Sequence, residues 1–121
     1  MNASLKATLR QALTALDDKK AYHVVALDVG AQTSLADVFV ICSAGSQRHA
    51  QAVVDEVSRV LSAHGVRPLS VEGYQQGGWI LMDYGDIILH VFLEERREYF
   101  ALERLWGDAP EIGARLHSAW P

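Results

Sequence analysis

Residues 72–106 of this chain read EGYQQGGWILMDYGDIILHVFLEERREYFALERLW, and this stretch decides the fold. Two short runs rich in aliphatic and aromatic residues flank a Tyr-Gly-Asp sequence, and an apolar stripe at helical spacing follows them. The pattern predicts a β-hairpin that leads into an amphipathic helix. We expect the hairpin to turn about Tyr84-Gly85, a register that places Trp79 directly opposite His90.

The alternation of side chains along the two hairpin strands separates two unlike faces. One face is purely aliphatic, as a core requires, and it carries Ile80, Met82, Ile87, Leu89 and Val91. The other face gathers aromatic, imidazole and carboxylate side chains around Leu81 and Ile88, and it carries Trp79, Asp83, Asp86, His90 and Phe92. This mixture favours a recognition surface over a core.

The length predicts a single domain over residues 1–121, with a tail after about residue 110 that is expected to fray. The formal net charge is −4, and the scattered Lys and Arg argue against nucleic acid as the main ligand. An acidic chain is better suited to docking on a basic protein surface. The single cysteine, Cys42, predicts a reducing compartment and therefore a cytoplasmic location. No apolar run reaches the roughly 18 residues of a spanning helix, so no membrane is expected.

Hydrophobic periodicity predicts the elements around the hairpin. Helices are expected over 4–20, from Ser46 as N-cap to Gly65 at the C-terminal end, and over 96–107, with a short helix after Pro110. Strands are expected over 23–29, 37–44, 66–72, 79–84 and 86–93. This order predicts an α/β fold, with a mixed five-stranded sheet and helices packed on it.

Residues 43–49 join a predicted strand to a predicted helix, and a helix N-terminus can hold an anion. Arg48 and a protonated His49 would add positive charge there. Capping and packing are the favoured interpretation, ahead of anion binding and, last, catalysis. A nucleotidyltransferase would carry paired metal-binding carboxylates on a strand soon after this turn, whereas Asp83 and Asp86 bracket the hairpin turn instead.

The histidines are dispersed and none shows the spacing of a zinc site, so neither a metal nor a cofactor is expected. They are His23, His49, His64, His90 and His117. His90 together with Asp83 or Asp86 suggests acid–base chemistry, but no nucleophile stands at a matching position. A histidine stacked beside Trp79 in a cross-strand pair is the favoured interpretation.

Two adjacent arginines open the predicted helix over 96–107, where the helix dipole disfavours cations. Arg96 and Arg97 therefore suggest selection by a partner. Trp79 and Tyr99 are open to interpretation as core residues. Because the opposite hairpin face already supplies an aliphatic core, and because Trp, Tyr and Arg are enriched at interface hot spots, an interface is favoured.

The chain resembles the ribosomal silencing factor family, also called Iojap-like, over residues 21–109. The resemblance rests on short motifs that are specific together: Ala26-Leu27-Asp28-Val29, Asp37-Val38-Phe39-Val40-Ile41, Gly45-Ser46-Gln47-Arg48-His49, Glu72-Gly73, Gly78-Trp79-Ile80-Leu81-Met82-Asp83-Tyr84-Gly85-Asp86, His90-Val91-Phe92 and Tyr99-Phe100-Ala101-Leu102-Glu103-Arg104-Leu105-Trp106.

This resemblance implies a nucleotidyltransferase-like fold without transferase activity or catalytic residues. It also implies binding to the large ribosomal subunit through ribosomal protein L-fourteen, which blocks joining of the small subunit and lowers translation when nutrients are scarce. Carried over by motif, the contact surface comprises Trp79, Asp83, His90, Phe92, Arg97, Tyr99 and Leu102. Homodimers are a further implication. The alternative function is a nucleotide-dependent transferase that uses the Gly45-Ser46 turn.

Overall fold

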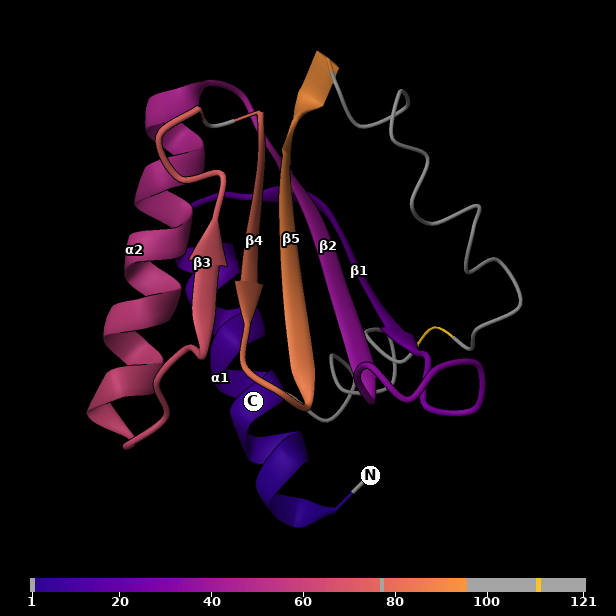
Figure 1. Cartoon of the computed structure of the whole chain (residues 1–121). Coiled ribbons are helices and arrows are strands. Elements are labelled where there is room, and N and C mark those ends of the chain that lie inside the picture. The colour runs from indigo at the N-terminus through magenta and orange to yellow at the C-terminus, as the bar shows by residue number, and fades with distance from the viewer. Residues whose placement is uncertain (1, 77, 96–110, 112–121) are drawn as a thin grey trace.

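The computed structural model describes residues 2–76, 78–95 and 111. In chain order its elements are α1 Ala3–Asp18, β1 Tyr22–Asp28, β2 Val38–Ala44, α2 Gln47–Ala63, β3 Ser70–Glu72, β4 Trp79–Asp83 and β5 Ile87–Leu93 (Figure 1). The predicted helix over 96–107 and the short helix after Pro110 lie outside the described residues.

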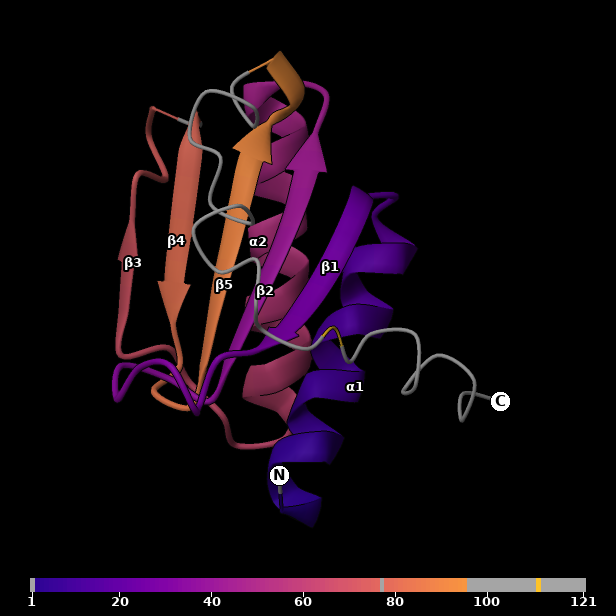
Figure 2. The ribbon, with the colours of Figure 1, turned by 90° about the vertical axis from the view of Figure 1, so that its right-hand side faces the viewer.

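The five strands form one sheet in the order β1-β2-β5-β4-β3. β2 and β5 run parallel, and the other neighbouring pairs are antiparallel. This arrangement confirms the predicted α/β class and the mixed five-stranded sheet, while the likeness to nucleotidyltransferases stays a prediction. Figure 2 shows that α1 and α2 cover the same face of the sheet. The two faces of the sheet therefore have different surroundings.

The face beneath the helices holds the main hydrophobic core, which the spacing of apolar residues predicted. Every aliphatic residue assigned to the core face of the hairpin is buried there, together with Val38, Val40 and Cys42 of β2. The helices contribute stripes at the 3.6-residue period, and these are Leu5, Leu9, Ala12, Leu13 and Leu16 from α1 and Ala50, Val53, Val54, Val57 and Leu61 from α2. Removing this apolar surface from water is the main driving force for the fold.

The strand predicted over 66–72 is wrong in its first half, because β3 covers only Ser70–Glu72. The amide of Val66 donates to the carbonyl of Leu61 at 2.9 Å, and so completes the end of α2 rather than a sheet. Pro68 has no amide hydrogen to donate to a neighbouring strand. Sheet-like hydrogen bonding begins at Leu69, whose amide donates to the carbonyl of Asp83 at 2.7 Å.

The hairpin register also differs from the prediction. Trp79 faces Phe92, and the predicted Trp79–His90 pairing is wrong because the turn residues are Gly85-Asp86 instead of Tyr84-Gly85. Gly85 takes a φ of +86°, which the first position of a tight hairpin turn requires. Moving the turn by one residue moves each cross-strand pairing by two, so the predicted division into two faces is confirmed.

Candidate functional site

The second sheet face, opposite the helices, carries a cluster of aromatic side chains that surrounds Trp79. Trp79 and Phe92 lie opposite each other on β4 and β5, with ring centroids 5.0 Å apart. His90 lies 5.9 Å from Trp79 and 5.1 Å from Phe39, which comes from β2. The strand order brings these rings together, because β5 lies between β2 and β4. We call Phe39, Trp79, His90 and Phe92 the aromatic cluster.

Burial within the aromatic cluster is uneven, and it corrects one expectation. Phe92 is 0% exposed and His90 is 4% exposed, whereas Trp79 is half-buried. The sequence favours a recognition surface over a core for this hairpin face, but Phe92 and His90 are buried in it. Phe92 belongs to a second hydrophobic cluster, formed by Leu27, Val29, Ala36, Phe39, Ile41 and Phe92, and Val25, Trp79 and Ile88 pack against it as partly buried residues. Within the aromatic cluster, Trp79 is the partly exposed member.

A hydrogen bond fixes the state of the His90 imidazole. The Nε1–H of Trp79 donates to Nδ1 of His90 at 3.1 Å, so Nδ1 carries no proton and the remaining hydrogen of the ring resides on Nε2. Burial lowers the pKa of His90 to about 4 because the charged form would lose its hydration. The imidazole is therefore neutral at physiological pH, and its Nδ1 is free of a proton to accept the hydrogen bond from the indole.

The segment that leads into Trp79 depends on a glycine. Gly73 takes a φ of +78°, and a Cβ at this position would clash with the carbonyl oxygen of Trp79. The backbone of Gly73 can therefore pass close to the start of β4 only because it has no side chain. This close approach fixes where β4 begins.

Three polar side chains of α2 hold the same segment from the helical side. Gln47 and Gln51 donate from their side-chain amides to the carbonyls of Gln75 and Tyr74, the latter at 2.9 Å. The Tyr74 hydroxyl donates to the carboxylate of Asp55 at 3.0 Å, and this bond raises the pKa of Tyr74. Their spacing of four residues places the α2 side chains on one helix face. This set was not predicted from the sequence, although the four-residue spacing of polar side chains along α2 was a signal for it.

The other predicted site residues divide into two groups. Asp83 is half-buried at the end of β4, and its Oδ1 accepts from the amide of Gly85 at 2.7 Å. Arg97, Tyr99 and Leu102 lie outside the described residues, so their place in a contact surface stays a prediction. Trp79 and Asp83 are thus the described members of the expected surface that reach solvent.

The turn over residues 43–49 is capped from within the chain. Ser46 is the N-cap of α2, as predicted, and its Oγ accepts from the amide of His49 at 3.0 Å. The amide of Gly45 donates to Nδ1 of His49 at 3.0 Å, and Nε2 of the same ring donates to the carbonyl of Lys19 at 2.7 Å. These bonds occupy amides that an anion would need. The geometry therefore favours the capping and packing interpretation.

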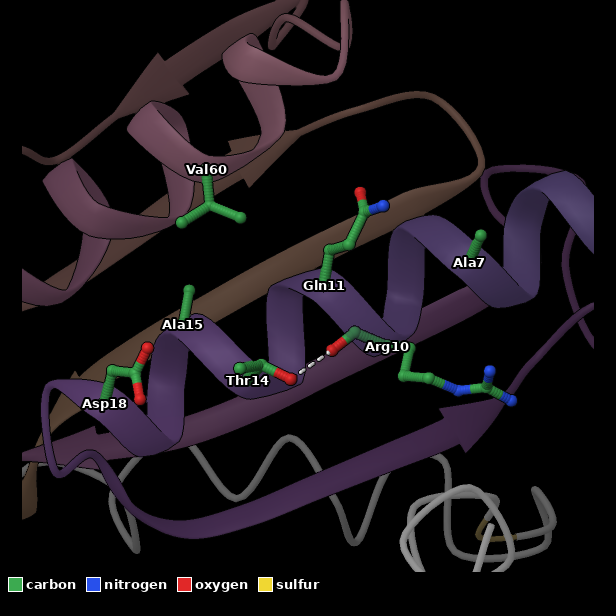
Figure 3. Close-up of a pocket in the computed structure, with 7 residues that line it drawn as sticks. All are labelled: Ala7, Arg10, Gln11, Thr14, Ala15, Asp18 and Val60. Atoms are coloured by element: carbon green, nitrogen blue, oxygen red, sulfur yellow. Dashed lines mark hydrogen bonds between the residues drawn. The ribbon is translucent and has the colours of Figure 1, made fainter. Parts of the chain in front are cut away.

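A cleft of about 370 Å³ lies between α1 and α2, on the helical side (Figure 3). It is lined by Ala7, Arg10, Gln11, Thr14, Ala15, Asp18 and Val60. The Thr14 hydroxyl donates to the carbonyl of Arg10, and Figure 3 shows the Arg10 guanidinium pointing away from Val60. Short side chains and separate charges line this cleft, and they form no acid–base pair.

Two kinds of feature are absent from the described residues. Within residues 2–76, 78–95 and 111, no group of three or more His, Cys, Asp or Glu side chains is placed to hold a metal ion. In the same part of the chain, no helix combines the length and apolar character needed to cross a membrane.

Comparison with known proteins identifies the family. Residues 2–119 match the family described as "Ribosomal silencing factor during starvation". A ribosomal silencing factor from Halalkalibacterium halodurans is 43% identical over 104 residues, which cover 86% of this chain and 89% of that protein. A crystal structure of a Chromobacterium violaceum protein is similar with a TM-score of 0.82 at 33% identity, covering 88% of each chain.

A more distant relative from Mus musculus is named "Mitochondrial assembly of ribosomal large subunit protein 1". It is 30% identical over 94 residues, which cover 75% of this chain and 41% of that protein. The family match spans nearly the whole chain, and the bacterial relative agrees with it over most of its length. The chain therefore belongs to the ribosomal silencing factor family.

Proposed function

We propose that this protein is a translational repressor that binds the large ribosomal subunit through ribosomal protein L-fourteen and sterically blocks joining of the small subunit. The family description names ribosomal silencing, and the name of the mouse relative refers to the large subunit. The motif resemblance supplies the protein contact and the steric mechanism. The proposal needs no catalytic residue and no cofactor, and it places the protein in the cytoplasm.

The observation that carries the proposal is the partial exposure of Trp79 beside buried aromatic neighbours. Trp79 is half-buried, while Phe92 and His90, its neighbours on the adjacent strand, are almost completely enclosed. A large side chain that is held rigidly and keeps one part in solvent loses little conformational entropy when it binds a partner. Trp79 suits the role of an anchor for this reason, with Arg97, Tyr99 and Leu102 as further contacts.

Charge supports a basic protein as the partner. The net charge is −4, and the hairpin that carries Trp79 has Asp83 before its turn and Asp86 within it. The acceptors at this end of the hairpin are complementary to Lys and Arg side chains of a partner. A homodimer is also part of the proposal, in which a second copy competes with the ribosome for the protein.

The test measures subunit association by light scattering, with purified protein added to separated ribosomal subunits. We expect inhibition that saturates as binding to large subunits saturates, measured in parallel by co-sedimentation. Trp79→Ala should abolish most of the inhibition. Gln11→Ala is the matched control, because Gln11 lines the cleft on the helical side of the sheet.

The same assay separates the proposal from a nucleotide-dependent transferase. A steric blocker should be indifferent to added nucleoside triphosphate, because it acts by occupying a surface. A transferase would need a metal held by carboxylates near the Gly45-Ser46 turn. Inhibition that appears only with a nucleoside triphosphate, or a modified ribosomal component in a mass spectrum, would overturn the proposal.

A further inference from the structure

We infer that His90 is a positioning residue for the docking surface: its neutral imidazole holds the Trp79 indole in the orientation that meets the partner. The inference rests on the proposed function and assigns His90 a role without direct contact. A residue that is 4% exposed has little surface to offer a protein partner. Its effect on docking must therefore pass through a neighbour, and Trp79 is hydrogen-bonded to it.

The sheet geometry makes this contact possible. Leu81 is the residue directly opposite His90, so Trp79 is a diagonal neighbour of His90 across the hairpin. Diagonal neighbours lie within reach of each other when the side chains are aromatic. The donor and acceptor atoms, Nε1 of Trp79 and Nδ1 of His90, lie 3.1 Å apart.

Two phenylalanines restrict the imidazole itself. The ring of His90 is nearly parallel to that of Phe92, with an interplanar angle of 7° and centroids 6.3 Å apart. Phe39 packs against it from β2 with an interplanar angle of 68° and centroids 5.1 Å apart. An acceptor held on two sides in this way can impose an orientation on its donor. Trp79 is thereby held by a hydrogen bond as well as by packing.

The surroundings of Nε2, the second ring nitrogen, indicate that stability alone does not explain a histidine at position 90. Because Nδ1 accepts from Trp79, Nε2 carries the hydrogen, and this donor is buried with no hydrogen-bond acceptor within the described part of the chain. A buried donor without an acceptor costs folding free energy, and phenylalanine at this position would avoid the cost. A side chain that lowers the stability of the fold is more readily explained by its effect on a functional neighbour, here Trp79.

The test compares two substitutions of His90. His90→Phe keeps an aromatic ring but has no acceptor, whereas His90→Asn keeps an acceptor close to the position of Nδ1. The first readout is the indole N–H resonance of Trp79 in a ¹H–¹⁵N spectrum. The chain has three tryptophans, so Trp79→Phe assigns the resonance. The second readout is affinity for isolated large subunits, and the third is the melting temperature.

We expect His90→Phe to shift the Trp79 indole resonance and to weaken affinity about tenfold, the equivalent of one lost hydrogen bond. Its melting temperature should equal or exceed that of the wild type. His90→Asn should recover the indole resonance and a substantial part of the affinity. Recovery by asparagine is a result that a purely structural role would not produce.

Three results would overturn the inference. They are unchanged affinity in His90→Phe, a lower melting temperature that accounts for the loss of affinity, and failure of His90→Asn to recover the affinity. Failure of the wild-type protein to bind large subunits is a different outcome. It would overturn the proposed function, and the inference about docking with it. The Trp79 indole resonance would then report only on the folded chain.

Discussion

Trp79 and Phe92 face each other directly across the β4–β5 hairpin, yet one is half-buried and the other is completely enclosed. Their rings lie 5.0 Å apart with an interplanar angle of 30°. Within this one pair, Phe92 belongs to the buried part of the second sheet face and Trp79 reaches its surface. Substitutions at the two positions should separate binding from stability.

Trp79→Ala should weaken binding to the large subunit by about 2 kcal/mol or more, as expected for a central aromatic anchor. The cost to the fold should be smaller, roughly 1–2 kcal/mol, because a half-buried side chain leaves a smaller cavity than a buried one. Co-sedimentation and a thermal melt on the same preparation measure the two effects. A large fall in melting temperature with binding retained would make Trp79 a core residue.

Phe92→Ala should show the opposite balance. Phe92 is 0% exposed and packs in the second hydrophobic cluster, so its removal should cost the fold about 3–5 kcal/mol in free energy of unfolding. Phe92→Leu conserves more volume and should lose less than half as much. Urea unfolding measures both variants. If Phe92→Ala is as stable as the wild type but fails to bind, Phe92 contacts the partner directly.

The division of the hairpin into two faces was predictable, but its register was not. Side-chain alternation has a period of two, so the turn can move by one residue without changing which residues share a face. The position of the turn depends on local chemistry at Gly85, whose positive φ and bond to Asp83 select Gly85-Asp86. The sequence alone does not distinguish a turn at Tyr84-Gly85 from a turn at Gly85-Asp86.

Burial of His90 and Phe92 was missed for a different reason. Phe39 and Ile41, which help to enclose this face, belong to β2, and β2 pairs with β5 in parallel although many residues separate them in the chain. Such long-range pairing leaves no periodic signal within either strand. The helix stripes, in contrast, depend only on local spacing, and the residues expected to form them are buried, except Val60 of α2, which is partly exposed.

Gly73→Ala should destabilise the protein more than Gly65→Ala does. Both glycines have nearly the same φ, +78° for Gly73 and +80° for Gly65. A methyl group at Gly65 meets nothing within 4 Å, so the cost is the backbone strain of about 1 kcal/mol. At Gly73 the methyl group would clash with the carbonyl of Trp79, which should bring the total to about 2–4 kcal/mol.

The two glycine variants also test how the start of β4 affects docking. Gly73→Ala should weaken binding to large subunits because it displaces the backbone of Trp79, whereas Gly65→Ala should bind like the wild type. Chemical denaturation and co-sedimentation provide the measurements. Equal behaviour of the two variants would show that the close approach of Gly73 to Trp79 contributes nothing.

The last prediction concerns pH. The pKa of His90 falls from an ordinary value of 6.5 to about 4 in the folded chain. Below pH 6.5 the unfolded chain therefore binds a proton that the folded chain does not bind, so the free energy of unfolding falls as the pH falls from 6.5 to 4. The contribution of the neutral imidazole to the free energy of unfolding is complete above pH 6.5 and stops changing below about pH 4. Each unit of pKa difference is worth about 1.4 kcal/mol.

Urea unfolding of the wild type and His90→Phe at pH 7.5 and pH 5.0 measures this contribution. Carboxylates change the stability of both proteins in the same way, so the difference between them isolates the histidine. The wild type should lose roughly 2 kcal/mol more than His90→Phe between these two pH values, because pH 5.0 lies about 1.5 units below the ordinary pKa. Equal losses would mean that the imidazole titrates normally, and that its burial beside Trp79 does not hold it neutral.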